Sequence, residues 1–320
     1  MTFKPPKRGV RSTSWSHAQL VDRALRAIDA GNRVLEALQQ SSEGACEHPI
    51  PENFPRAKAI AETALLLHAA AKVWDDHPRL RDAGMALARR LTPLARDASV
   101  LGAICTDPAQ ARCHATAHLI LSRLGLPHRG IDALLAQCRP FEQACHPELL
   151  PFRTLEQHWL SQLQQPGKAV ERNARRDLAR SALGRPLDRL AGSRIDFYAF
   201  THAVLYATDF GERRPFMTRS LRDIANDADA ALAYAIEHDD YDLAAELLLT
   251  WPMLGIRWSP TSLFALNMLA TIEGELGFVP GLQFQRTIFD DISGPDRSWY
   301  ALMSSYHTMY VMGFLWTACL

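Results

Sequence analysis

The sequence lacks a long apolar run. Its longest apolar stretch is the C-terminal end, residues 309–320, which is too short for a bilayer span of roughly 20 apolar residues. Residues 1–15 (MTFKPPKRGVRSTSW) contain no apolar core of the kind that a secretory signal needs. We therefore expect a cytoplasmic protein without a membrane partner, and a buried last helix. Residues 1–16 are expected to be a flexible segment ahead of the helical part.

An excess of one charge sign is also absent. Lys and Arg together number 35, and so do Asp and Glu, which gives a formal net charge of zero. Proteins that bind nucleic acids normally carry a basic excess that faces the phosphates. The two short basic runs, at residues 4–11 and 172–176, fit a solvated tail and a helix surface. The composition therefore argues against a nucleic-acid partner.

Several standard motifs are missing. The six cysteines form no CxxC pair, and without a secretory signal we expect them to be reduced thiols. His114 and His118 are spaced as in HExxH zinc proteins, but Ala115 stands where the catalytic glutamate would be. There is no GxGxxG followed by strand and helix, no P-loop and no GxSxG. Nucleotide-dependent and serine-hydrolase chemistry therefore have no support.

Strand signals are scarce, whereas helix signals recur along the whole chain. Val and Ile are sparse, and runs that alternate apolar with polar residues are absent. The fold class is therefore predicted to be all-α, with stacked antiparallel helical hairpins in a closed α/α toroid or an α-solenoid. Apolar periodicity predicts helices over residues 17–39, 55–74, 80–97, 108–124, 130–138, 154–163, 170–183, 195–209, 218–237, 240–250, 260–276 and 298–318.

Two predicted helices have clear entry signals. Asp107-Pro108 and Ser259-Pro260 each place a capping side chain before a proline at the first helical position. Gly125 and Gly277 suit the ends of these helices. The segment QQPGK at residues 164–168 separates a more polar front from a more aromatic rear. We treat residues 17–320 as one helical unit that this segment would divide into halves, 17–165 and 168–320.

The segment THAVLYATDFG (201–211) carries the main candidate site. It belongs to a stretch that is apolar nearly all round, and such a helix is normally buried. His202, Tyr206 and Asp209 stand at i, i+4 and i+7 and project from one face. Because burying a polar group without a partner costs on the order of 2–7 kcal/mol, they either satisfy one another or line a cavity. In a cavity, His202 transfers protons, Asp209 orients it or binds a cation, and Tyr206 donates to a developing negative charge.

A purely structural interpretation stands beside this one. Asp209 would cap the turn that follows, with Phe210-Gly211 ending the helix. His202 and Tyr206 would form a hydrogen-bonded pair that only fixes the packing. The sequence alone leaves both interpretations open.

Two further segments carry candidate groups. His307 lies in the apolar final helix and becomes a catalytic candidate if it faces His202. Asp242 and Glu246 share one helix face at i and i+4 without a lysine partner, in HDDYDLAAELLLTW (238–251). Aligned carboxylates with histidine hold divalent cations, but they can also be the wet side of a helix with Asp239 as its N-cap. The predicted metal ligands are Asp242 and Glu246, together with His202, Asp209 and His307.

Four segments resemble a known family. THAVLYATDFG, PFRTLEQHWL (151–160), YDLAAELLLTWP (241–252) and YHTMYVMGFLW (306–316) are similar to an uncharacterised bacterial family of helical proteins, a 6895-like domain of unknown function with a THxxxYxTDFG segment. The resemblance is close over residues 150–320 and loose before them. Members are often found near specialised-metabolite genes, which implies a role in making or modifying a natural product, such as a peptide. No activity is assigned to the family, so the resemblance implies no catalytic residue.

Two functions fit these observations. In the first, an enzyme encloses a cavity lined by apolar side chains such as Trp251, Trp258, Trp299, Trp316 and Phe200. Proton transfer or a divalent metal ion there would act on a small molecule or peptide, by cyclisation, elimination or metal-dependent oxidation. In the second, a non-catalytic helical scaffold or accessory subunit binds a peptide or a partner protein, and the polar stripe only packs. A homodimer is compatible with either function.

Overall fold

The computed structural model describes residues 15–43, 50, 51, 53–144, 149–165 and 171–320. All regular elements in these ranges are helical, and the ranges contain no strand. The prediction of an all-α fold is therefore confirmed. The predicted flexible segment 1–16 lies almost wholly outside the described residues. In the part of the chain that is described, no helix has both the length and the apolar character needed to span a bilayer.

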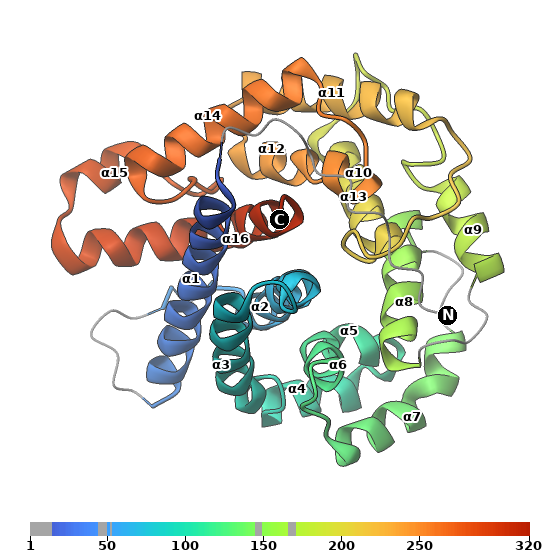
Figure 1. The fold of residues 1–320 in the computed structure, drawn as a ribbon. Coiled ribbons are helices and arrows are strands. Elements are labelled where there is room, and N and C mark those ends of the chain that lie inside the picture. The colour runs from blue at the N-terminus through green and yellow to red at the C-terminus, as the bar shows by residue number, and fades with distance from the viewer. Residues whose placement is uncertain (1–14, 44–49, 52, 145–148, 166–170) are drawn as a thin grey trace.

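Six helices form an inner ring. Each packs against the next in chain order, and the last packs against the first, so their contacts close a cycle (Figure 1). The choice between toroid and solenoid stays a prediction, and this cycle favours the closed form. The ring consists of α2 (Arg56–Ala70), α6 (Thr116–Arg123), α8 (Pro151–Gln164), α10 (Arg194–Thr208), α12 (Tyr241–Leu248) and α16 (Gly294–Ala318).

The other helices pack around this ring or connect its members. Figure 1 shows α7, α9, α11 and α14 toward the outside of the molecule. These helices are α1 (His17–Glu43), α3 (Pro78–Leu94), α4 (Ala98–Thr106), α5 (Ala111–His114), α7 (Arg129–Ala144), α9 (Glu171–Arg180), α11 (Leu221–Glu237), α13 (Thr250–Leu254), α14 (Pro260–Leu276) and α15 (Arg286–Asp291), with 3₁₀ turns η1 (Ala71–Val73) and η2 (Pro108–Gln110).

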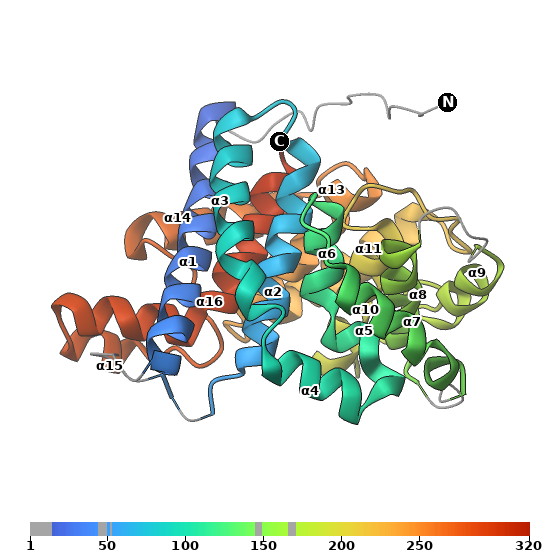
Figure 2. The same ribbon diagram turned by 90° about the horizontal axis from the view of Figure 1, so that it is seen from below.

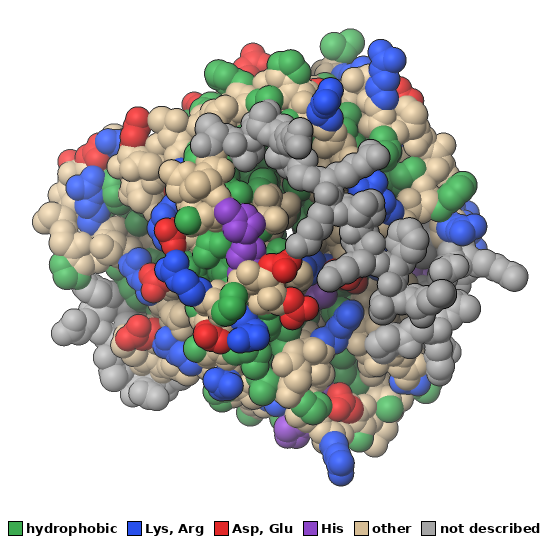
Figure 3. All heavy atoms as spheres, viewed as in Figure 1, with side chains coloured by type: hydrophobic (Ala, Val, Ile, Leu, Met, Phe, Trp, Pro, Cys, Tyr) green, Lys and Arg blue, Asp and Glu red, His purple; other side chains and the backbone are tan. Residues whose placement is uncertain are grey.

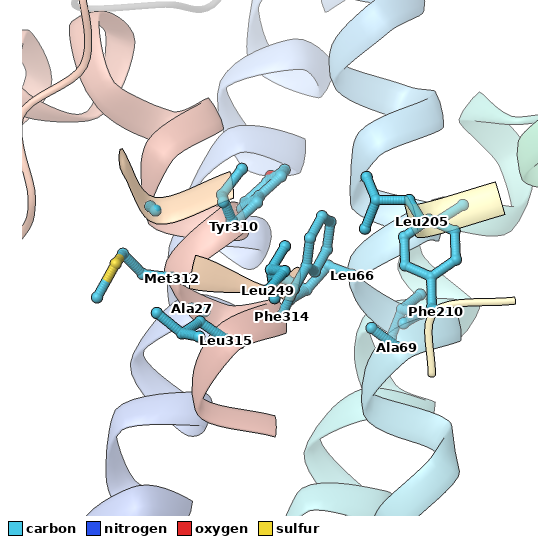
Figure 4. Close-up of a cluster of buried hydrophobic side chains, with 14 of the residues drawn as sticks. Ala27, Leu66, Ala69, Leu205, Phe210, Leu249, Tyr310, Met312, Phe314 and Leu315 are labelled. Atoms are coloured by element: carbon cyan, nitrogen blue, oxygen red, sulfur yellow. The ribbon is translucent and has the colours of Figure 1, made fainter. Parts of the chain in front are cut away.

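The first and last long helices join the two ends of the chain. α1 packs against α16, α2 and α3, and these helices lie side by side in Figure 2. A glycine permits this close approach, because a Cβ at Gly313 would lie only 2.5 Å from the Cβ of Ala27. Figure 4 shows the buried cluster around this contact, with Leu66 from α2 and Phe314 from α16 beside Phe210. Helices from the front and the rear of the chain therefore pack together along α1, α2 and α16, and also where α8 contacts α9 and α10.

Helix boundaries follow the capping signals in some places and depart from them in others. α14 begins after Ser259 and ends at Gly277, which has a φ of 85°, as the sequence predicted. The predicted helix 108–124 is wrong as one element, because it is broken into η2, α5 and α6 with Ala115 between the last two. The N-cap of α12 is Asp240, whose side chain accepts from Leu243 N, and not Asp239.

Charges of both signs are mixed on the surface. On the face drawn in Figure 3, Lys and Arg side chains alternate with Asp and Glu side chains over the described residues. This distribution agrees with the formal net charge of zero.

Candidate functional site

Two adjoining cavities lie within the inner ring. The first, which we call the ring cavity, has a volume of about 420 Å³ and is lined by side chains from all six ring helices. The second, the neighbouring cavity, measures about 440 Å³ and is bordered by α2, α10, α12 and α16 and by residues 281–283. The cavities meet at the residues that line both, which are Lys58, Glu62, His202, Glu246 and His307.

Three of these side chains, Glu62, Glu246 and His307, converge with Asp242 of the neighbouring cavity. His307 Nδ1 lies 2.9 Å from Glu62 Oε1, and His307 Nε2 lies 3.6 Å from Asp242 Oδ2 and 3.5 Å from Glu246 Oε1. One possible ligand atom from each of Asp242, Glu246 and His307 lies within 4.8 Å of the other two. We call Glu62, Asp242, Glu246 and His307 the acid–histidine cluster.

Hydroxyl groups on the ring helices fix two carboxylates of the cluster. Tyr198 Oη donates to Asp242 Oδ2 at 2.6 Å, and Thr308 Oγ1 donates to Asp242 Oδ1 at 2.7 Å. Thr201 Oγ1 donates to Glu246 Oε2. Each of these carboxylates therefore has a defined orientation before any ligand is bound.

Other atoms of the cluster are buried but not satisfied. Glu62 Oε2 and His307 Nδ1 are buried, and neither has a hydrogen-bond partner in the described structure. The 2.9 Å approach of His307 Nδ1 to Glu62 is thus a charge contact without hydrogen-bond geometry. A buried polar atom without a partner costs about 1–3 kcal/mol, so the cluster can gain stability from a ligand.

The cluster attracts positive charge. Burial alone would lower the pKa of His307, but the charges of Asp242 and Glu62 outweigh it and raise that pKa well above its usual value. Burial raises the pKa of Glu246, and its interactions with His202, His307 and Thr201 together more than reverse this effect. Glu62, Asp242 and Glu246 are 9%, 6% and 4% exposed, so solvent screens these carboxylates only weakly.

His202 and Tyr206 face the ring cavity but do not bond to each other. His202 Nδ1 lies 2.7 Å from the carbonyl oxygen of Tyr198. Since that oxygen can only accept, Nδ1 carries the proton of the neutral ring and Nε2 is the acceptor. Tyr206 Oη donates to Glu156 Oε1 at 2.9 Å. The predicted hydrogen-bonded pair is therefore wrong, although the two rings lie 6.2 Å apart.

Asp209 lies outside the cluster that the sequence predicted it to join. α10 ends at Thr208, and Asp209 follows in a left-handed conformation with φ 50°. Its carboxylate accepts from His68 Nε2 at 2.8 Å and from Trp159 Nε1 at 2.7 Å, and it lines neither of the two cavities. The carboxylate of Asp209 therefore pairs with α2 and α8 instead of capping the turn that follows α10, and the helix ends at Thr208, before Phe210-Gly211.

Other expectations about the lining and the metal ligands need correction. His118 Nε2 pairs with Asp132 at 2.9 Å, whereas the nearest acid to His114 is a different residue, Asp107, at 3.7 Å. In the described part of the chain, the metal-type group found is Asp242, Glu246 and His307. The aromatic side chains that line the ring cavity are Trp159, Tyr206, Tyr310 and Phe314 instead of the predicted ones.

Sequence reasoning missed several groups that complete the site. Glu62 is the acid that α2 contributes, and Tyr198 and Thr308 orient Asp242. A signal for Glu62 exists, because it stands in a largely apolar helix (RAKAIAETALLLHAA) and is 9% exposed. Tyr198 stands four residues before His202, on the same face of α10.

Comparison with known proteins assigns the family and nothing finer. No curated protein and no solved structure matches the chain. The family match extends over both the front and the rear of the sequence, including the residues before position 150, where the four resembling segments are absent. The chain belongs to the family described as a domain of unknown function (DUF6895), whose model matches residues 21–317.

Proposed function

We propose that the protein is a cytoplasmic enzyme of specialised metabolism that holds a divalent metal ion in the ring. Asp242, Glu246 and His307 would be its ligands, and Glu62 a fourth. The observation that carries the proposal is the convergence of these four side chains, from three helices, at the place where the two cavities meet. Exposed acids on the surface would not support a metal site. These three acids are buried, and hydroxyl groups orient Asp242 and Glu246.

The charge balance favours a cation over a closed ion-pair network. Three carboxylates face one imidazole within the cluster, and the nearest lysine, Lys58, has its Nζ 3.5 Å from Glu62. The side chain of Lys58 is 54% exposed, so its contribution is screened. A bound dication would neutralise the excess and satisfy the unpartnered oxygen of Glu62. Oxygen-rich sites with an imidazole suit Mn²⁺ or Fe²⁺.

The cavity supplies a proton acceptor beside this site. His202 borders both cavities, and because Nδ1 faces the carbonyl oxygen of Tyr198, Nε2 is the acceptor nitrogen of the neutral ring. A metal ion of this kind polarises a substrate carbonyl, and His202 would then take a proton from the neighbouring carbon. Proton removal of this type begins both eliminations and cyclisations, which are the reaction classes that we propose.

The size of the site agrees with a small-molecule or peptide substrate. Ligand sites in proteins commonly measure roughly 300–1,000 Å³, and the ring cavity and the neighbouring cavity fall in this range. The ring cavity also presents apolar aromatic walls from Trp159, Tyr310 and Phe314. A substrate of the proposed enzyme would therefore combine a carbonyl group with an apolar body.

Metal binding tests the proposal directly. We expect the purified full chain to bind about one equivalent of Mn²⁺ by isothermal titration calorimetry. Glu246→Gln removes one charged ligand and should weaken this binding by at least about 100-fold, since even the loss of an outer partner of a ligand costs roughly 10–100-fold. Tyr206→Phe is the matched control, because Tyr206 lines the same cavity but is not in the cluster.

The outcomes separate the two functions considered from the sequence. Equal Mn²⁺ affinity in the wild type and Glu246→Gln, or no binding in either, would overturn the metal-dependent enzyme. Helicity measured by circular dichroism must be unchanged for the comparison to count. If Mn²⁺ binds, His202→Gln should keep the affinity within about threefold, because His202 is proposed to move protons and not to hold the metal.

A further inference from the structure

A third cavity lies beside the ring and carries a concentration of arginine. It measures about 390 Å³ and is bordered by α8, α9, α10 and residues 213–216. Arg175, Arg213 and Arg214 line it, and its lining includes no Asp or Glu among the described residues. We call it the arginine pocket. Its walls are otherwise largely apolar, with Leu155, Leu178 and Phe216 among them.

The acids near this pocket are already engaged elsewhere. Asp177 Oδ2 pairs with His158 Nε2 at 2.7 Å, and the carboxylate of Asp209 accepts from His68 and Trp159. Arg213 Nε lies 4.0 Å from Asp209 Oδ2, which is too long for a hydrogen bond. Among the described residues, the walls of the pocket therefore carry three arginines and no carboxylate, and Asp209 lies at the limit of ion-pair distance from one of them.

One buried donor of the pocket's arginines has no partner among the described residues. Arg213 Nη1 donates to Gln162 Oε1, whereas Arg213 Nε is buried and has no hydrogen-bond partner in the described structure. Arg175 stacks on the exposed ring of Phe216, with its guanidinium carbon 5.1 Å from the ring centroid. Arginine binds carboxylate and phosphate through paired N–H groups. The arrangement is that of an anion site with an aromatic wall.

We propose that the arginine pocket binds the oxyanion head of an organic anion, a carboxylate or a phosphate, whose apolar body lies against Phe216 and Trp159. Trp159 and Tyr206 line both this pocket and the ring cavity, so these two side chains form part of the wall between the bound molecule and the ring cavity. The proposal does not depend on a metal ion in the ring.

Three matched probes test this inference on the full chain. Phenylacetate and phenyl phosphate carry the two oxyanions, and phenylacetamide is the neutral counterpart of the first. We expect one of the anions to bind at least about tenfold more tightly than phenylacetamide, because hydrogen bonds to charged groups are the strong ones. The tighter anion identifies the head group. Equal affinity for all three probes would overturn the proposal.

Arginine variants locate the site. Arg175→Gln and Arg214→Gln should each weaken binding of the tighter anion by about tenfold. Both side chains are exposed, so the melting temperature should stay unchanged. Arg129→Gln, an exposed arginine at the start of α7, is the matched control and should bind as the wild type does. Wild-type affinity in both pocket variants would place the anion elsewhere. Unchanged affinity in Glu246→Gln would show that the pocket is independent of the metal site.

Discussion

At the scale of single residues, Asp209 is the clearest case of a buried charge with a structural task. It joins His68 of α2, Trp159 of α8 and the end of α10, and Lys72 Nζ donates to its backbone oxygen. Burial would raise the pKa of Asp209, but the hydrogen bond from His68 and the charge of Lys72 outweigh it and hold this pKa below its usual value. Asp209 is therefore ionised, and its Oδ1 accepts both hydrogen bonds.

We predict that Asp209→Asn lowers the free energy of unfolding by about 1–3 kcal/mol, because the hydrogen bonds from His68 and Trp159 lose a charged acceptor. Asparagine tolerates the left-handed backbone at φ 50°, so the change removes charge without adding strain. Urea unfolding at pH 7 measures the effect. Mn²⁺ affinity should be unchanged, because Asp209 lines neither ring cavity. A loss of Mn²⁺ binding in a folded Asp209→Asn variant would show that Asp209 takes part in metal binding.

The same pairing has a defined dependence on pH. The pKa of Asp209 is lower in the folded chain than its usual value of about 3.8, so its contribution to stability is complete above about pH 4 and is lost as the pH falls through the folded-state pKa. The unfolding free energy of the wild type should therefore drop more steeply below pH 4 than that of Asp209→Asn.

The residues of the site show what local sequence can reveal and what it cannot. The i, i+4 spacing placed Asp242 and Glu246 on one face, and they do converge with His307. Asp209 was assigned to the same face as His202 by extending helical periodicity seven residues. That extension fails because the helix ends one residue earlier, at Thr208. Spacing has meaning only while the backbone stays helical.

At the scale of elements, α10 depends on its first turn. Ser193 and Asp196 form a capping box, in which the Ser193 side chain accepts from Asp196 N and Asp196 accepts from Ser193 N at 2.8 Å. We predict that Ser193→Ala destabilises the protein by about 1 kcal/mol, the usual effect of losing an N-cap. Ser298→Ala, at an exposed position in α16, is the control and should change stability by less than about 0.5 kcal/mol. Equal urea midpoints for both variants would contradict this role.

Helix positions were predictable where a cap and a glycine bracket the element, as at Ser259 and Gly277. They were not predictable where packing interrupts a periodic stretch. Residues 108–124 have one apolar pattern, yet the backbone turns at Ala115, where ψ is 10°. This break lies between α5, which contacts α7 and α8, and α6, which contacts α2 and α8. Such tertiary contacts override local propensity.

At the scale of the whole molecule, the site exists because the ring brings distant segments together. Glu62 and His307 are separated by most of the chain, and their contact depends on the packing of α2 against α16. Taken alone, Glu62 is an acid and His307 a histidine in a largely apolar helix, and neither residue identifies its partner. Sequence reasoning identified three of the four cluster residues, but no local pattern states which helices become neighbours, and so it missed Glu62.

The packing of α16 against α1 and α2 gives the last prediction, in which two glycines respond oppositely to the same change. A Cβ at Gly313 would lie 2.5 Å from Ala27 Cβ and 2.8 Å from Leu66 Cδ1. Gly313→Ala should therefore lower the free energy of unfolding by about 1–3 kcal/mol through overpacking. The higher helix propensity of alanine offsets up to about 1 kcal/mol of this loss. Gly274 in α14 has nothing within 4 Å of its Cβ position, and Gly274→Ala should stabilise by about 0.5–1 kcal/mol.

Urea unfolding of the two variants measures these effects against one wild type. Both changes add the same methyl group to a helix interior, so propensity alone would shift both midpoints upward. Only a closely packed α16 makes the signs differ. The Gly313 variant should also bind Mn²⁺ more weakly than the Gly274 variant, because displacing α16 moves His307 away from Glu62 while leaving every proposed ligand in place. Stabilisation of both variants would mean that α16 does not pack as closely against α1 and α2 at Gly313 as the structure shows.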